Sequence, residues 1–230
     1  RQMCIRDRGT IEESQTEDKD WINNWKEFFH QFYVDDILIV PSWEEIKEED
    51  KDKMILHIDP GTAFGTGMHE TTQLVIRQLK KYVKPGIALL DVGTGSGILG
   101  ITALKLGAGH VVGTDLDPCA VPAVQDNKEA NQIVDDTFDM MIGNIIDDKE
   151  VQDQVGYEKY DIVAANILAD VLVPLTPVIV HQMKKGAYYI TSGILDVKEE
   201  VVKEAVQKAG LTLVEVTRQG EWVCVTARKD

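Results

Sequence analysis

The stretch DVGTGSGILG, residues 91–100, is a glycine-rich turn between a buried-type strand and an apolar helix. Glycine adopts backbone conformations that other residues avoid, and it lets a ligand approach the main chain closely. The glycines of this turn fit two patterns. Counted from Gly95, they read G-x-G-x-x-G, which is typical of dinucleotide-binding loops. Counted from Asp91, they read as an acid followed by G-x-G-x-G, which is typical of loops that bind S-adenosylmethionine (SAM).

Around this turn, strands and helices are expected to alternate. Apolar runs predict strands at 87–92, 110–115, 137–142, 160–166 and 187–193, and helical patterns predict helices at 98–106, 117–131, 168–183 and 197–209. Such alternation predicts parallel βαβ units. Two final strands, 211–218 and 221–228, follow each other so closely that they predict a hairpin. We therefore expect an α/β fold with a Rossmann-like, doubly wound sheet of seven strands, mostly parallel, with an antiparallel strand from the C-terminal hairpin. A plain dinucleotide-binding sheet lacks that hairpin.

The N-terminal part predicts a tail and a linker. Residues 1–20 do not begin with Met and are polar after the first few positions, so we expect a disordered or artefactual tail. The aromatic spacing of WINNWKEFFHQFYV, 21–34, predicts a linker helix. DILIVP, 36–41, and MILHID, 54–59, predict short strands. The expected organisation is a tail (1–20), a linker helix with short strands (21–58) and a catalytic domain (59–230).

Composition narrows the class of protein. The chain has 230 residues and a net charge of -15, and such a surface repels the phosphate backbone of nucleic acids. Its three cysteines form no C-x-x-C pair, which argues against a disulfide framework or a zinc site and favours a reducing compartment. No apolar run reaches the roughly 20 residues that span a bilayer. We expect a cytoplasmic protein with no metal, no membrane contact and no direct nucleic-acid contact.

Two acids stand at strand ends beside the glycine turn. Asp91 is badly placed beside a pyrophosphate but suits the ammonium and sulfonium groups of SAM; alternatively, it caps the turn through backbone N–H groups. Asp115 ends the next strand, where an acid accepts hydrogen bonds from ribose hydroxyls in either cofactor. We predict a SAM site with Gly93, Gly95 and Gly97 as its floor, Asp91 at the methionine moiety and Asp115 at the ribose.

Two further segments are expected near the mouth of this site. DPGTAFGTGMHETT, 59–72, is either a flexible connection or a close cover over a ligand. One of its two final threonines, Thr71 or Thr72, is expected to cap the next helix, and His69 is a candidate base, although a lone loop histidine is more often not one. Asn166 lies at the carboxyl end of a strand, where catalytic groups collect.

The chemistry of Asn166 favours methyl transfer to an amine. An amide can orient an amine without protonating it, so Asn166 is the predicted catalytic residue. The residues that follow it, Ile-Leu-Ala, include no aromatic ring that would stack on a flipped nucleobase. The sequence therefore argues against a nucleic-acid base as the substrate.

Several segments together resemble the PrmA-type ribosomal protein methyltransferases over about residues 20–230. They are DPGTAFGTGMHETT, LLDVGTGSGILGI, GTDLDP, ANILAD, SGIL (192–195) and EWVCVTARK. The resemblance implies SAM contacts at Thr72, Gly93, Asp115 and Asn166, and Thr72 follows from it alone. It also implies methylation of lysine side chains and the N-terminal amine of a large-subunit ribosomal protein. Members of the family begin with a small α/β domain that recognises this protein. We expect that domain to be missing here, which would weaken substrate recognition.

Three alternatives remain open from the sequence. An NAD-dependent oxidoreductase would bind NADH and would need a hydride acceptor site, for which no residue set is visible. A SAM-binding module without turnover would bind SAM but transfer nothing. A class I methyltransferase for a small molecule would differ only in the substrate that it accepts.

Overall fold

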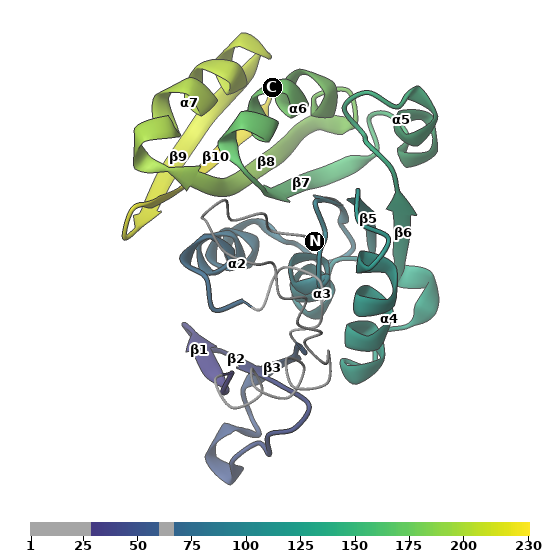
Figure 1. The fold of residues 1–230 in the computed structure, drawn as a ribbon, viewed down its shortest axis with the longest axis vertical. Helices are drawn as coiled ribbons and strands as arrows, with labels where there is room; N and C mark the ends of the chain where they lie inside the picture. The colour runs from purple at the N-terminus through teal and green to yellow at the C-terminus, as the bar shows by residue number, and fades with distance from the viewer. Residues whose placement is uncertain (1–28, 60–66) are drawn as a thin grey trace, which may run out of the picture. The chain divides into compact units, whose positions relative to one another are not determined.

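The central sheet has seven strands in the order β6-β5-β4-β7-β8-β10-β9 (Figure 1). The structure is a computed structural model that describes residues 29–59 and 67–230. The strands are β4 (Ala88–Val92), β5 (His110–Asp115), β6 (Phe138–Ile142), β7 (Tyr160–Asn166), β8 (Met183–Leu195), β9 (Leu211–Gln219) and β10 (Trp222–Lys229). Neighbours from β6 to β8 pair in parallel, whereas β10 is antiparallel to both β8 and β9. The predicted Rossmann-like sheet with an antiparallel strand from its C-terminal hairpin is confirmed.

Helices cover both faces of this sheet. They are α2 (Glu70–Tyr82), α3 (Ile98–Lys105), α4 (Ala120–Ala130), α5 (Lys149–Val155), α6 (Ala169–Ile179) and α7 (Glu199–Lys208). In Figure 1, α2, α3 and α4 lie below the sheet, and α5, α6 and α7 lie above it. Each set of three helices contributes to its own hydrophobic cluster with the sheet. The short helix α5 was not predicted from the sequence.

The strands are apolar on both faces because both faces are covered. In β7, Ile162 and Ala164 pack in the cluster with α2 and α3, whereas Val163 and Ala165 pack in the cluster with α6 and α7. All four side chains are at most 1% exposed. This two-sided burial holds the carboxyl ends of the strands, where the site lies, in a fixed register.

A second, three-stranded sheet precedes α2. Its strands are β1 (Phe32–Val34), β2 (Ile37–Val40) and β3 (Met54–His57), with the 3-10 turn η2 (Glu48–Asp50) before β3. β1 and β2 are antiparallel, and β2 and β3 are parallel. The apolar side chains of this sheet share the cluster of α2 and α3.

The two short strands predicted at 36–41 and from residue 54 are confirmed, but the predicted linker helix is wrong at its C-terminal end. Phe32–Val34 is a strand, because an aromatic and β-branched run suits a paired strand. Asp35, with a φ of 55°, makes the turn that returns the chain as β2. Residues 21–28 of that helix, and the tail at 1–20, lie outside the described residues. The domain boundary after residue 58 stays a prediction.

Candidate active site

A cavity of about 510 Å³ opens where β4, β5 and β7 end. That volume is within the usual range for small-molecule sites. Four of the predicted site residues line it, namely Gly93, Gly95, Asp115 and Asn166. The other predicted residues, Thr72, Asp91 and Gly97, do not line the cavity but stand directly behind or beside those that do.

The glycine turn forms one wall of the cavity. Gly93, Gly95 and Gly97 have φ values of 76°, 54° and 82°, in the left-handed region that glycine adopts without strain. A Cβ atom on Gly93 would lie 2.5 Å from Cγ2 of Ile167, which also lines the cavity. A side chain at this position would therefore collide with a neighbouring part of the cavity wall.

The backbone amides of the turn are already engaged within the protein. Gly95 N donates to Asp115 Oδ2 at 2.8 Å, Gly93 N donates to the Thr114 carbonyl, and Gly97 N donates to the Thr94 carbonyl. A pyrophosphate needs free N–H groups at this point, and here it would meet a carboxylate instead. The turn therefore does not suit a dinucleotide.

Asp115 is held from two sides. Its Oδ2 accepts from Gly95 N, and its Oδ1 accepts from Asp117 N at 2.9 Å. A carboxylate has about four acceptor positions, so two remain for the hydroxyl groups of a ribose. Asp117 does not cap α4, which starts at Ala120, but it accepts from Cys119 N in the preceding turn.

Asp91 lies beneath the turn and is completely buried. Its Oδ2 accepts from Gly100 N at 3.2 Å, and its Oδ1 has no hydrogen-bond partner among the residues that the structure describes. Burial raises the pKa of this carboxyl group to about 8; the Gly100 N–H acts in the opposite direction, and the charge of Asp115 adds to the rise. The bond to Gly100 N matches the alternative in which Asp91 supports the turn. Direct contact with a methionine moiety stays a prediction.

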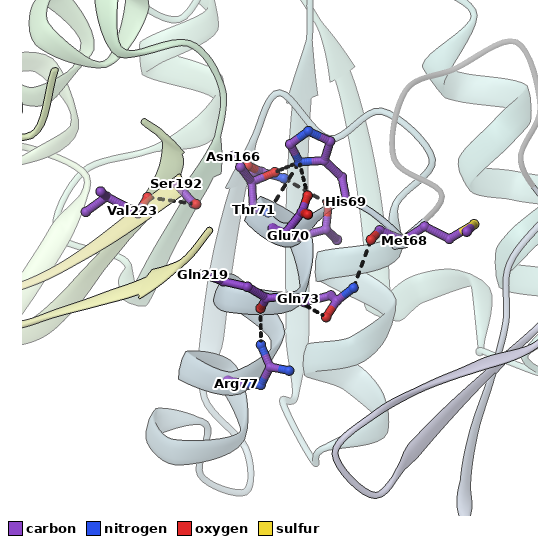
Figure 2. A network of polar contacts seen from close by, with 11 residues as sticks. Met68, His69, Glu70, Thr71, Gln73, Arg77, Asn166, Ser192, Gln219 and Val223 are labelled. Atoms are coloured by element: carbon purple, nitrogen blue, oxygen red, sulfur yellow. Dashed lines mark hydrogen bonds and ion pairs between the residues drawn. The ribbon is translucent and has the colours of Figure 1, made fainter. Parts of the chain in front are cut away.

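Asn166 is oriented by the start of α2. Its Nδ2 donates to Thr72 Oγ1 at 3.0 Å, and the Thr72 side chain is buried between α2 and β7 (Figure 2 shows the surrounding network). Because the nitrogen is engaged by Thr72, Oδ1 is the acceptor that Asn166 can offer to a ligand in the cavity. Asn166 also pairs with Ser192 of β8, whose Oγ donates to the Val223 carbonyl.

The predicted helix cap by Thr71 or Thr72 is wrong. His69 is the N-cap of α2, and its Nδ1 accepts from Thr71 N at 3.3 Å. The two threonine hydroxyls have other partners, His69 and Asn166. The His69 ring also meets Trp222 edge-on, with ring centroids 4.8 Å apart. Both rings line the cavity.

Several lining residues were missed by the sequence reasoning. They include Leu116 after β5, the segment 143–146 after β6, Gly193 in β8 and Trp222 at the start of β10. The apolar side chains among them can cover a flat aromatic base. Leu116 and the segment 143–146 each follow a parallel strand, and that position was a usable signal, because ligand-binding residues gather there in open α/β sheets.

The described parts of the chain, 29–59 and 67–230, contain no group of three or more His, Cys, Asp or Glu side chains that could hold a metal ion. Within the same ranges, no helix combines the length and the apolar character needed to cross a membrane.

Comparison with known proteins gives concordant matches. The sequence profile of the family described as ribosomal protein L11 methyltransferase (PrmA) matches residues 2–230. The ribosomal protein L11 methyltransferase of Agathobacter rectalis is 57% identical over 224 residues, which are 96% of this chain and 69% of the relative. The protein of the same name from Lachnospira eligens is 59% identical over 222 residues, 96% of this chain and 70% of the relative.

Solved structures agree with the fold. A ribosomal protein L11 methylase from Lactobacillus delbrueckii subsp. bulgaricus superposes with a TM-score of 0.78 at 31% identity, covering 88% of this chain and 100% of that one. An S-adenosylmethionine dependent methyltransferase from Mesorhizobium loti gives a TM-score of 0.54 at 11% identity, covering 67% of this chain and 95% of that one. The second match shows the fold alone.

Proposed function

This chain belongs to the ribosomal protein L11 methyltransferase (PrmA) family, and from that premise we propose that it transfers methyl groups from SAM to amino groups of ribosomal protein L11. Membership makes it a SAM-dependent methyltransferase and excludes the NAD-dependent oxidoreductase that the glycine pattern left open. The observation that carries the proposal is Asn166, whose nitrogen is held by Thr72 while its side chain borders the cavity.

The described residues fit SAM. Gly93 and Gly95 would form the floor of its site, with Gly97 completing the turn beside them, and Asp115 would accept from its ribose hydroxyls. Asp91 would stand beneath its methionine end as the nearest buried acid. This fit rests on the positive φ values of the glycines and on the two acceptor positions left on Asp115. When bound, SAM supplies an electrophilic methyl group on a positively charged sulfonium.

The residues of the chain would prepare the amine. An amine attacks through its lone pair, so it must arrive neutral and be held with that lone pair directed at the methyl group. Asn166 Oδ1 would accept an N–H of the amine and fix its direction without giving it a proton. Ile167 and Trp222 also border the cavity and would keep water from the reacting atoms.

The proposed amines are lysine side chains and the N-terminal α-amine of L11, and the proposed compartment is the cytoplasm. Protein amines are cationic at neutral pH, and the net charge of -15 favours the approach of a basic partner. We assign the transfer to residues 59–230, which include all the described residues that line the cavity.

Incubation with radiolabelled SAM tests this function. The substrate is unmodified L11, and the control is L11 whose amino groups have been blocked by acetylation, because an acetylated nitrogen no longer offers a nucleophilic lone pair. Label on the unmodified protein alone, mapped to lysine and N-terminal positions by mass spectrometry, is the expected result. If calorimetry shows that the chain binds SAM but no label reaches L11, the proposed substrate is wrong.

A further inference from the structure

His69 borders the cavity within reach of the aromatic ring of Trp222. A histidine in such a position is the usual candidate for the base that removes a proton from an incoming amine. Whether it can serve depends on which ring nitrogen has a free lone pair. The hydrogen bonds around its ring answer that question.

The Nδ1 atom of His69 is engaged as an acceptor. The backbone N of Thr71 donates to it at 3.3 Å, and Thr71 Oγ1 lies 2.9 Å from it. Glu70 Oε2 is 3.9 Å away, beyond hydrogen-bonding distance. A backbone N–H can only donate, so the lone pair of Nδ1 points at α2 and the neutral ring carries its proton on Nε2. His69 can then take up another proton only by giving up its contact with the helix.

That contact organises the first turn of α2. The His69 carbonyl accepts from Thr72 N at 3.1 Å, and its imidazole accepts from Thr71 N. Thr72 in turn receives the hydrogen bond from Asn166 Nδ2. Figure 2 shows the His69 ring close against the start of the helix, with Asn166 beside it. The orientation of Asn166 therefore depends on the turn that His69 caps.

We propose that His69 is a positioning residue and not a base. Its Nδ1 caps α2, which holds Thr72 against Asn166 and so sets the direction in which the amide faces the amine. The proton of the incoming ammonium goes to water before transfer. The effect on methyl transfer rests on the proposed function, whereas the hydrogen-bonding role of the ring does not.

Two substitutions separate these roles. Asparagine is among the best N-cap residues but is not a base at neutral pH, and alanine is neither. We expect His69→Ala to lower kcat about tenfold, with little change in the affinity for SAM, since a small misplacement of a positioning group has a large effect on rate. His69→Asn should return kcat to within about threefold of the unaltered chain.

His110→Asn is the control, because His110 contacts Asp139 instead of the cavity. Equal, severe losses in both His69 variants would overturn the proposal.

A second measurement does not depend on the substrate. Long-range ¹H–¹⁵N correlation spectra report the tautomer of each histidine, and the His69 signals are those that disappear in His69→Asn. A neutral ring protonated on Nε2 at pH 8 is expected, and a ring protonated on Nδ1 would overturn the proposal. If the tautomer is as expected but L11 receives no label, the proposed substrate is wrong, whereas the proposal that His69 caps α2 is retained.

Discussion

Asp91→Asn tests whether a protonated carboxyl group supports the glycine turn. Asp91 is fully buried, and burial raises the pKa of its carboxyl group from 3.8 to about 8. Between these values the native chain keeps a proton that the unfolded chain has released. The stabilising contribution of Asp91 is therefore fully present below about pH 4 and is lost as the pH rises through about 8.

The magnitude follows from one proton. A difference of one bound proton changes the free energy of unfolding by about 1.4 kcal/mol per pH unit. Between pH 5 and pH 7 the unaltered chain should lose about 3 kcal/mol relative to Asp91→Asn. An amide has the shape of a protonated carboxyl group but does not titrate, and its oxygen can still accept from Gly100 N.

Urea unfolding of both proteins, followed by tryptophan fluorescence at pH 5 and pH 7, gives this difference directly. Asp126→Asn is the control, because Asp126 is exposed on α4 and the same replacement there involves no buried carboxyl group. The advantage of Asp91→Asn should be larger at pH 7 than at pH 5. An advantage that is equal at both values, within about 0.5 kcal/mol, would mean that Asp91 titrates alike in the folded and unfolded chains and would refute the reasoning.

Three more substitutions, one of them with a matched control, test the cavity and the residue that supports Asn166. Asp115→Ala should weaken SAM binding by about 1–3 kcal/mol, because a charged acceptor is lost, and unchanged affinity by calorimetry would remove the ribose contact. Gly193→Ala would place a Cβ 2.3 Å from the Ile167 carbonyl oxygen, so thermal unfolding should show a loss of about 1–3 kcal/mol. Gly210→Ala, with φ of 82° but open space around it, should lose less. Thr72→Val should lower kcat about tenfold, because the amide of Asn166 loses its hydrogen-bond acceptor, and an unchanged rate of labelled methyl transfer would contradict this role.

The sequence predicted the sheet well because its signals are local and repeated. Strands buried on both faces produce short apolar runs, and the closing hairpin is marked by a two-residue gap. The structure places that gap one residue further on, at Gly220 and Glu221. Helix α5 (Lys149–Val155) was missed because its seven residues bury only Val151 and Val155, too few to show a helical period.

The cavity was predictable only where its residues end a strand. Gly93 follows a recognisable strand and Asp115 and Asn166 each end one, and parallel strands bring such positions to one edge. Which residue caps α2 depends on the path of the chain into the helix. From the sequence, His69, Thr71 or Thr72 could each have supplied the cap. Trp222 reaches the cavity only because β10 inserts between β8 and β9. No periodicity in the sequence carries that information.

The segment 91–100 fits both glycine patterns because its glycines serve two different purposes. Those at 93–97 adopt positive φ and shape the turn, whereas Gly100 is part of α3, and a Cβ there would lie 2.6 Å from the ring of Phe138. Gly100 thus allows a helix to pack closely on the sheet, which either cofactor fold requires. Asp115 discriminates between the two cofactors, because its carboxylate occupies an amide of the turn that a pyrophosphate would need. Asp91 is buried beneath the turn with its pKa raised to about 8, so it keeps its proton at neutral pH and adds no full charge there. The glycines therefore indicate how closely a ligand can approach, and Asp115 indicates which charge that ligand can carry.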